Sequence, residues 1–426
     1  MLSRRRFVQT SSLAVTATAC GVARGDDDGG GTDSLPPSLA ALTSMKDQAT
    51  PISVDERRAR LEKARRLMTE NRIDALMLTG GTSLVYFTGM SWGLSERMTA
   101  VIVPARGDAF IVTPQFEEER TLEQARTGPL GANTRVMTWE EDESPSALVA
   151  QGLRDAGIAS GSIGVEETVR FVFSNMVATA APAVRITSGT PVTAGCRMVK
   201  DQHELALMRL ASQVTLKAYE AAWKALADGM TQDQFGDLVA QAHRQLGFSG
   251  SAGVQVGEYS AMPHGSVQPQ VIREGSILLI DGGCKVEGYS SDLSRTFVLG
   301  RATDRMKSVF DLELRAQSAA LAAAKPGVEC QAVDAAARKV IEDGGFGPGY
   351  KFFTHRVGHG MGMDGHEWPY LVKGNTLKLE PGMTFSDEPG IYIPGEFGVR
   401  LEDDMVITEA GAELFTPQST SLETPF

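Results

Sequence analysis

Hydrophobic and polar residues alternate with two periods along residues 54–195, one typical of helices and one typical of strands. The segment DERRARLEKARRLMTENR (55–72) has Leu61, Ala64 and Met68 at helical spacing, which predicts an amphipathic helix. The apolar run DALMLT (74–79) predicts a buried strand, and MTAVIVPARGDAFIVTP (98–114) predicts two strands around a turn. The pattern therefore predicts a mixed α/β domain over residues 54–195, and this segment contains no histidine.

The pattern changes at Cys196, where longer helical segments begin. Asp201 with Glu204, and Thr231 with Gln234, are spaced as capping boxes that open two helices. Two further helices are predicted at 303–326 and 330–343, and strand-rich segments at 270–300 and 375–408. Residues 196–426 are therefore predicted to form an α+β domain with helices over a largely antiparallel sheet.

The N-terminus carries a targeting pattern rather than a fold pattern. SRRRFVQ (3–9) precedes a short apolar run, as in twin-arginine export signals. We expect a signal peptide over residues 1–19, a flexible linker over 20–53, and a periplasmic or cell-envelope location. Cleavage before Cys20 has two interpretations, a soluble protein or a lipid anchor at Cys20, and the polar tether GDDDGGGTDSLPPS (25–38) favours the anchor.

Composition and charge narrow the class of protein. A chain of 426 residues suggests two or three domains, and 42% hydrophobic with 22% charged residues is typical of soluble globular proteins. The net charge of −12 argues against a nucleic-acid partner. The four cysteines have no paired spacing, so neither a disulfide framework nor a cysteine-rich zinc site is expected.

Two segments share a plan of strand, acid, glycine-containing turn, strand and acid. They are ILLIDGGCKVEGYSSDLSRTFVLG (277–300) and MTFSDEPGIYIPGEFGVRLEDDMVIT (383–408). In a hairpin, Asp281 would lie opposite Asp292, and Glu388 opposite Glu402 across a Pro-Gly-Glu loop. Facing carboxylates about 4 Å apart repel by roughly 4 kcal/mol at an effective dielectric of about 20, so bound cations are the cheapest resolution. Solvated strand ends are the alternative interpretation.

Histidines supply a further set of candidates. His355, His359 and His366 fall within THRVGHGMGMDGHEWPY (354–370), among glycines that allow backbone to approach a site closely. Arg356 follows His355, so this is not the H-E-x-x-H zinc motif. His264 lies in a loop before the first acidic strand, whereas His203 and His243 lie on helical patterns and are expected at the surface.

The order Asp281, Asp292, His359, Glu388, Glu402 resembles the five-ligand signature of the pita-bread metallopeptidases. The segments IDGG…SSDLSRTF, VGHGMGMDGHE and DEPGIYIPGEFGVRLEDD appear in the family order, and SLVYFTG (83–89) resembles the creatinase-like N-terminal domain. The resemblance covers about residues 54–410. It implies a creatinase-like domain over 54–195 and a pseudo-symmetric antiparallel pita-bread domain with covering helices over 196–426. It also implies cleavage of Xaa-Pro bonds, as by an Xaa-Pro aminopeptidase or a prolidase, and a homodimer.

The resemblance further implies a role for each site residue. Asp281 would bind one metal ion, Asp292 and Glu402 would bridge two, and His359 and Glu388 would bind the second. Glu388 would also act as the general base toward a bridging hydroxide. The resemblance makes four further residues catalytic: His264 on the leaving group, His355 and His366 on the substrate and the tetrahedral intermediate, and Arg400 pairing with carboxylates behind the ligands. Four carboxylates and one imidazole favour Mn²⁺, with Co²⁺ or Zn²⁺ as alternatives.

Four acids and Trp368 lie close in sequence to the predicted ligands. Asp387 stands where the family more often has an apolar residue, Glu396 is expected to be solvated, and Asp403 and Asp404 are expected behind the ligands or at the surface. Trp368 is expected to shape a pocket for the proline ring or another apolar group. A sulfoniopropionate-cleaving lyase on the same scaffold and a metal-free binding protein are the alternative functions. The sequence does not choose between dipeptides and longer peptides.

Overall fold

The computed structural model describes residues 35–426, and the predicted signal peptide with the first part of the linker lies outside the described residues. The last part of the predicted linker is structured, because it forms the short helix α1 (Pro37–Ala40) and the 3₁₀ turn η1 (Lys46–Gln48). Leu39 in α1 is fully buried, and the Ser38 hydroxyl donates to the carbonyl of Ala221 at 2.8 Å. This segment is therefore packed against the second half of the chain.

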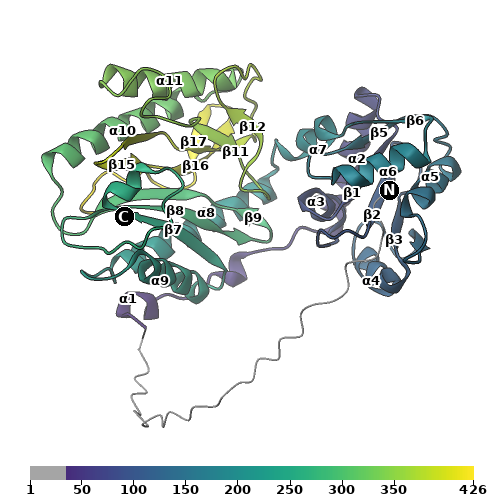
Figure 1. The fold of residues 1–426 in the computed structure, drawn as a ribbon, viewed down its shortest axis with the longest axis horizontal. Coiled ribbons are helices and arrows are strands. Elements are labelled where there is room, and N and C mark those ends of the chain that lie inside the picture. The colour runs from purple at the N-terminus through teal and green to yellow at the C-terminus, as the bar shows by residue number, and fades with distance from the viewer. Residues whose placement is uncertain (1–34) are drawn as a thin grey trace, which may run out of the picture. The chain divides into compact units, whose positions relative to one another are not determined.

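A six-stranded mixed sheet organises the first half, in the order β4-β3-β2-β1-β5-β6 (Figure 1). Its strands are β1 (Ala75–Thr79), β2 (Ala100–Pro104), β3 (Phe110–Pro114), β4 (Arg135–Trp139), β5 (Gly161–Val165) and β6 (Val184–Ser188). Its helices are α2 (Val54–Glu70), α3 (Thr82–Thr88), η2 (Gln115–Glu117), α4 (Glu118–Thr127), α5 (Pro145–Asp155), α6 (Phe171–Ala180) and α7 (Thr190–Arg197). The predicted helix at 55–72 and the strands at 74–79 and 98–114 are confirmed.

Both faces of this sheet are covered, which explains why β1 and β2 are buried at every position and largely apolar. Leu76 and Leu78 of β1 point into a core shared with α2 and α7, whereas Ala75 and Met77 point into a core shared with α5 and α6. Alternate residues of one strand thus serve two different cores.

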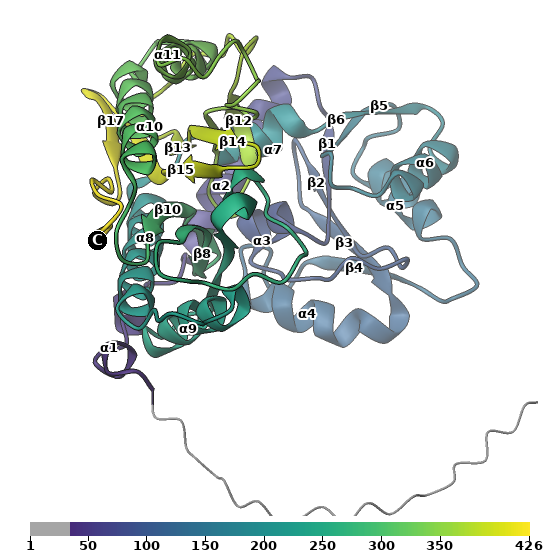
Figure 2. The ribbon, with the colours of Figure 1, turned by 60° about the vertical axis from the view of Figure 1, so that its left-hand side comes forward.

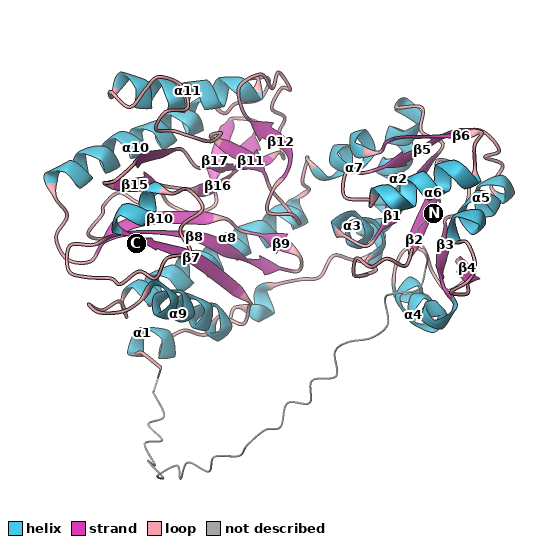
Figure 3. Ribbon diagram, viewed as in Figure 1, coloured by secondary structure: helices cyan, strands magenta, loops and turns pink. Residues whose placement is uncertain are grey.

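The second half consists of antiparallel sheets with helices packed on them (Figure 3). Its helices are α8 (Gln202–Trp223), α9 (Gln232–Gln245), α10 (Asp304–Ala323) and α11 (Cys330–Asp343), with a 3₁₀ turn η3 (Gly257–Ala261). Its strands are β7 (Gly250–Val256), β8 (Ile277–Val286), β9 (Tyr289–Ser290), β10 (Leu293–Val298), β11 (Gly358–Gly360), β12 (Glu367–Leu371), β13 (Thr384–Asp387), β14 (Gly390–Ile393), β15 (Phe397–Arg400), β16 (Asp403–Thr408) and β17 (Gly411–Leu414). Both predicted capping boxes are present, at Asp201 with Glu204 and at Thr231 with Gln234.

The strands form a β10-β8-β7 sheet with β9 on β8, a β12-β11-β13-β16-β17 sheet, and the β14-β15 ribbon. The two larger sheets meet at an isolated bridge between Ser294 and Glu402. Helices α8 and α9 pack on the β7–β8 side, while α10 and α11 lie beside each other, α10 near β13 and β15 and α11 near β12 (Figure 2). The bridge brings together the two segments that carry the predicted acids.

None of the helices within residues 35–426 has both the length and the apolar composition needed to cross a membrane. Among the described residues, Cys196, Cys284 and Cys330 are buried free thiols.

Candidate metal centre

The first acidic hairpin, residues 277–298, carries Asp281 on β8 and Asp292 just before β10. A two-residue turn at Glu287-Gly288 pairs Val286 with Tyr289, and this register places Asp281 opposite Ser294. The prediction that Asp281 lies opposite Asp292 is wrong by two residues. A shift of two keeps a side chain on the same face of the sheet, so the two carboxylates still meet diagonally across the strands.

The second acidic hairpin, residues 384–408, has the expected register. Nearer the turn, Gly390 pairs with Arg400. Farther from the turn, Asp387 pairs with Asp403. The same register places Glu388 directly across from Glu402. The loop is Pro394-Gly395-Glu396, as predicted, and Gly395 has φ +78, a conformation that glycine adopts readily. Glu396 is exposed at this loop, as expected.

His359 is held in β11 between two glycines that leave no room for a side chain. A Cβ on Gly358 would lie 2.1 Å from the Ser386 carbonyl oxygen, and one on Gly360 would lie 2.5 Å from the Glu367 carbonyl oxygen. The His359 Nδ1 lies 3.1 Å from the Gly360 carbonyl oxygen. An Nδ1–H donating there leaves Nε2 free as a ligand, the arrangement typical of metal-binding histidines.

The five predicted ligands form one cluster. Ligand atoms of Asp281, Asp292 and Glu402 lie within 4.8 Å of one another, and so do those of His359, Glu388 and Glu402. The two groups share Glu402. A third group of the same span joins Asp292, His359 and His366. Residues that are far apart in the sequence thus lie together in a single site.

The charges of this cluster are strongly perturbed. Burial and the charge of Asp281 raise the pKa of Asp292 to about 7, and burial together with Asp292 raises the pKa of Glu402 well above its usual value. Burial would also raise the pKa of Glu388, but the hydrogen bond from His359 and the nearby positive charges outweigh it and lower the pKa to about 2. Buried carboxylates packed this closely fit a bound cation, because a cation removes the repulsion that otherwise forces a proton onto them.

Arg400 supplies part of that positive charge within the protein itself. It is 3% exposed, its guanidinium lies 2.7 Å from Asp281, and its Nε donates to the Ser294 hydroxyl at 2.9 Å. The carboxylate that it contacts is a predicted ligand, not a group behind the ligands as expected from the sequence.

The three remaining candidate histidines occupy different positions. His355 Nδ1 lies 3.9 Å from Glu388, and its Nε2 lies 2.7 Å from the Tyr392 hydroxyl. The His366 ring stacks on the His359 ring with 3.6 Å between centroids. His264 is exposed and lines a separate cavity with Gln255, and it makes no hydrogen bond within the described residues. The structure therefore brings His355 and His366 to the cluster and leaves His264 outside its contacts.

Ser294 is a site residue that the sequence analysis missed. Its hydroxyl oxygen lies 2.8 Å from Asp281 and 2.7 Å from Glu402, so it links the two acidic hairpins. A hydroxyl two residues after Asp292 in SSDLSRTF, hence on the same strand face, was the available signal. Tyr392 was also missed, although its hydroxyl contacts both His355 and Arg400.

The acids beside the ligands are interior residues. Asp387, Asp403 and Asp404 are fully buried, so a surface position, one of the two expected for Asp403 and Asp404, is excluded. Asp404 lies behind the ligands, because it accepts the backbone N–H of Asp292 at 3.1 Å. Asp403 pairs with Arg295 at 2.6 Å, whereas neither carboxylate oxygen of Asp387 has a hydrogen-bond partner in the part of the chain that the structure describes.

Comparisons with known proteins agree with this geometry. The family model of "Metallopeptidase family M24" matches residues 206–409. The family model of the "Creatinase/Prolidase N-terminal domain" matches residues 60–199. The probable dipeptidase PepE of Mycobacterium tuberculosis is 35% identical over 356 residues, which are 83% of this chain and 92% of that protein. The Xaa-Pro dipeptidase of Lactobacillus delbrueckii subsp. lactis is 32% identical over 372 residues, 85% of this chain and 98% of that protein.

Solved structures show the same fold. The dipeptidase PepE from Mycobacterium ulcerans superposes with a TM-score of 0.82 at 32% identity, over 88% of this chain and 99% of that one. A prolidase from Thermococcus sibiricus gives a TM-score of 0.77 at 26% identity, over 86% of this chain and 98% of that one. The predicted fold class, a creatinase-like domain followed by a pita-bread domain, is confirmed. The lyase alternative gains no support from these relatives.

Proposed function

Because this chain belongs to metallopeptidase family M24 and carries a creatinase/prolidase N-terminal domain, we propose that it hydrolyses Xaa-Pro peptide bonds with two divalent metal ions. The observation that carries the proposal is the pair of ligand groups, Asp281–Asp292–Glu402 and His359–Glu388–Glu402, which share Glu402. Two groups joined by a shared carboxylate are the arrangement that two adjacent ions need. The substrate class follows the Xaa-Pro dipeptidase and prolidase relatives.

The metal ions would supply Lewis acidity and lower the pKa of a water molecule. Oxygen donors outnumber the single imidazole, which favours Mn²⁺, with Co²⁺ or Zn²⁺ as alternatives. The protein holds the site through Asp281, Asp292, His359, Glu388 and Glu402. Arg400 fixes Asp281, and Ser294 joins Asp281 to Glu402, so the ligand geometry is set before substrate binds.

The chain's own groups would then move protons and hold the substrate. Glu388 would act as the general base, and the Ser386 hydroxyl, which donates to it at 3.1 Å, orients its carboxylate. His355, held by Tyr392, and His366, stacked on His359, would donate hydrogen bonds to charge that develops on the substrate. His264, in its exposed loop, would reach the leaving amide when substrate is present.

The test is a hydrolysis panel on the Mn²⁺-loaded protein with Xaa-Pro, Xaa-Pro-Yaa and non-proline peptides. We expect release of the amino-terminal residue only where proline follows it, and elemental analysis should find two metal ions per chain. Hydrolysis of non-proline peptides at equal rates would contradict the specificity, and one ion per chain would contradict the dinuclear site. The ratio of dipeptide to tripeptide hydrolysis would decide between a prolidase and an aminopeptidase.

We also propose export by the twin-arginine route and assembly as a homodimer. The motif SRRRFVQ supports export, and the polar segment after Cys20 supports a lipid anchor there. Replacing Arg4 and Arg5 with lysine should retain the protein in the cytoplasmic fraction, and Cys20→Ala should release it from membranes. If light scattering gave a molecular mass equal to that of one chain, this result would contradict the homodimer.

A further inference from the structure

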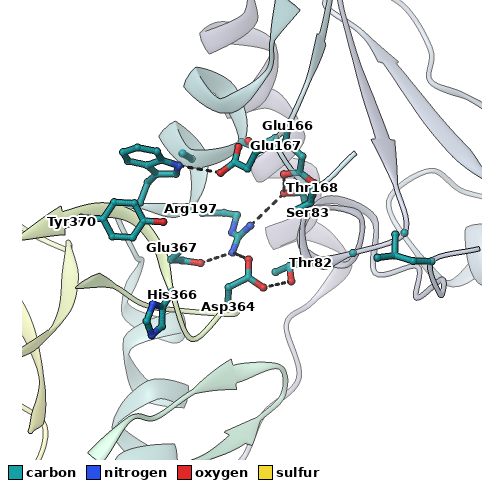
Figure 4. Close-up of a pocket in the computed structure, with 16 residues that line it drawn as sticks. Thr82, Ser83, Glu166, Glu167, Thr168, Arg197, Asp364, His366, Glu367 and Tyr370 are labelled. Carbon is teal, nitrogen blue, oxygen red and sulfur yellow. Dashed lines mark hydrogen bonds and ion pairs between the residues drawn. The ribbon is translucent and has the colours of Figure 1, made fainter. Parts of the chain in front are cut away.

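A cavity of about 460 Å³ has His366 and several charged side chains in its walls (Figure 4). Its walls come from the start of α3, the loop after β5, the end of α7, and residues 364–370 around the start of β12. Cavities of this size hold small ligands or a long side chain. The cavity is formed by both halves of the chain, so neither half contains it alone.

The cavity is adjacent to the reacting atoms. His366 lines it, stacks on the ligand His359, and has a ring nitrogen within 4.8 Å of ligand atoms of Asp292 and His359. A peptide whose scissile bond lies at the metal centre therefore has the cavity within reach of one of its neighbouring side chains.

Part of the charge in the cavity is balanced internally. Arg197 pairs with Asp364 at 2.5 Å and also contacts Glu367, and Lys200 pairs with Glu367 at 2.6 Å. Two cations thus offset two carboxylates, which fixes this wall in place without leaving a net charge on it.

Glu166 and Glu167 line the opposite wall, and neither forms an ion pair with another residue in 35–426. Glu166 accepts from the Ser83 hydroxyl at 2.6 Å through one oxygen, and no residue in 35–426 donates to its other oxygen, although the side chain is only 8% exposed. Glu167 accepts from the Thr190 hydroxyl at 2.6 Å and from the Trp368 ring N–H at 3.0 Å, both neutral donors. Glu167 is exposed, whereas Glu166 is buried with only a neutral donor. Burying the Glu166 carboxylate without a cation is costly, which points to a positively charged group arriving with the ligand.

Aromatic rings complete the wall beside these acids. The rings of Trp368 and Tyr370 lie 4.7 Å apart, and Trp368 is 42% exposed. Such rings pack against the aliphatic stem of a long basic side chain and attract its cationic end. Trp368 therefore borders a cavity that also contains acidic side chains.

We propose that this cavity binds the side chain of the residue before proline and selects lysine or arginine at that position. The inference rests on the proposed Xaa-Pro hydrolysis. An acidic cavity repels the carboxylate end of an Xaa-Pro dipeptide and attracts its amino end, so electrostatics orient the Xaa residue toward it. Proline carries no charged side chain, so the residue before it is the variable position that Glu166 and Glu167 can discriminate.

The experiment compares kcat/KM for Lys-Pro, Met-Pro and Glu-Pro on the metal-loaded, full-length protein. Lysine and methionine have similar length, so their ratio isolates the side-chain charge. We expect Lys-Pro to exceed Met-Pro by about tenfold or more, with Glu-Pro the poorest substrate. Glu166→Gln keeps an acceptor for Ser83 but removes the charge, and it should lower the Lys-Pro to Met-Pro ratio several-fold. Glu409→Gln, which removes one exposed carboxylate outside the cavity, is the matched control and should leave the ratio unchanged.

The other outcomes of this experiment would reject either the subsite alone or the subsite together with the proposed function. Equal kcat/KM for Lys-Pro and Met-Pro, unaffected by Glu166→Gln, would reject the subsite and leave Xaa-Pro hydrolysis intact. An equal loss for both dipeptides in Glu166→Gln would mean that the acid binds the α-ammonium group instead of the side chain. No hydrolysis of any Xaa-Pro dipeptide would reject the proposed function together with the subsite. If Glu166→Gln does not fold, Glu167→Gln carries the same comparison.

Discussion

The two acidic hairpins share a plan but differ in what lies behind their carboxylates. Beside Asp292, the Ser291 hydroxyl accepts the Cys284 N–H at 3.1 Å and lies 2.8 Å from the Thr215 hydroxyl, so hydroxyls provide a neutral layer of support. Charged groups contact this pair of acids as well, because Arg400 pairs with Asp281 and Asp404 accepts the Asp292 N–H. Behind Glu388 and Glu402, Asp403 is fully buried and held by Arg295, Thr416 and Gln317. The first half of the centre thus includes a layer of hydroxyls, whereas the second half has the buried Arg295–Asp403 ion pair behind its acids.

The difference also shows that the two halves depend on each other. Arg295 belongs to β10 of the first hairpin, yet its charge partner Asp403 belongs to β16 of the second. Ser294, next to it, contacts acids of both hairpins. The pseudo-symmetric halves are therefore joined by charge at the site where the metal ligands meet.

The largest effect should come from removing a shared ligand. Glu402→Gln in the second hairpin and Asp292→Asn in the first should each lower kcat/KM by more than about 100-fold, beyond the loss typical of groups behind the ligands. Metal content measured by elemental analysis should fall in parallel. Glu396→Gln, an exposed acid on the same second hairpin, is the control and should retain activity. A fully active Asp292→Asn protein would contradict the assigned ligand set.

The next effect tests the buried ion pair. Arg295→Met leaves Asp403 buried without its cation and should reduce the free energy of unfolding by about 3–5 kcal/mol, measured by urea denaturation. Arg305→Met breaks the exposed pair with Glu396, 3.2 Å long, and should cost about 0–1 kcal/mol. Equal costs for the two variants would remove the proposed distinction between the hairpins.

A smaller loss is expected from the neutral support. Ser291→Ala removes the acceptor of the Cys284 N–H and should cost about 1–3 kcal/mol in the free energy of unfolding. Ser249→Ala, at an exposed position, should change stability by less than about 0.5 kcal/mol. A cost for Ser291→Ala as large as that of Arg295→Met would show that both hairpins are supported equally strongly.

The smallest effect concerns the turns. Glu287 in the first hairpin has φ +49, which costs a non-glycine residue energy, and Asn followed by Gly is the preferred pair in such two-residue turns. Glu287→Asn should stabilise the protein by about 0.5–1 kcal/mol. Glu396→Asn in the three-residue loop of the second hairpin, where glycine already occupies the positive-φ position, should change stability by less than about 0.5 kcal/mol. Thermal unfolding of both variants measures the contrast, and an equal shift in both would contradict it.

Local sequence patterns predicted many of the helices and strands, and the family resemblance supplied the candidate ligands. Helix periodicity and capping boxes predicted α2, α8 and α9, and glycines around His359 predicted the close backbone approach that Gly358 and Gly360 make. These features depend on residues only a few positions apart, so the sequence contains them completely. The sequence also predicted which residues of each strand lie on the same face of the sheet. For this reason Asp281 and Asp292 still meet at the site, although the predicted pairing of these two residues was wrong.

Tertiary structure decided which polar residues are interior. His243 was expected at the surface of its helix, and this is wrong, because the ring is fully buried with Nδ1 2.9 Å from the Val239 carbonyl oxygen. Asp387 and Asp403 are buried because α10 and β10, some 70 to 110 residues earlier in the chain, cover them with Gln317 and Arg295. Glu166 and Glu167 acquire the proposed substrate role only because they face residues 364–370, about 200 positions away. Burial and charge pairing arise from contacts between distant segments, so a local pattern of acids and apolar residues cannot specify them.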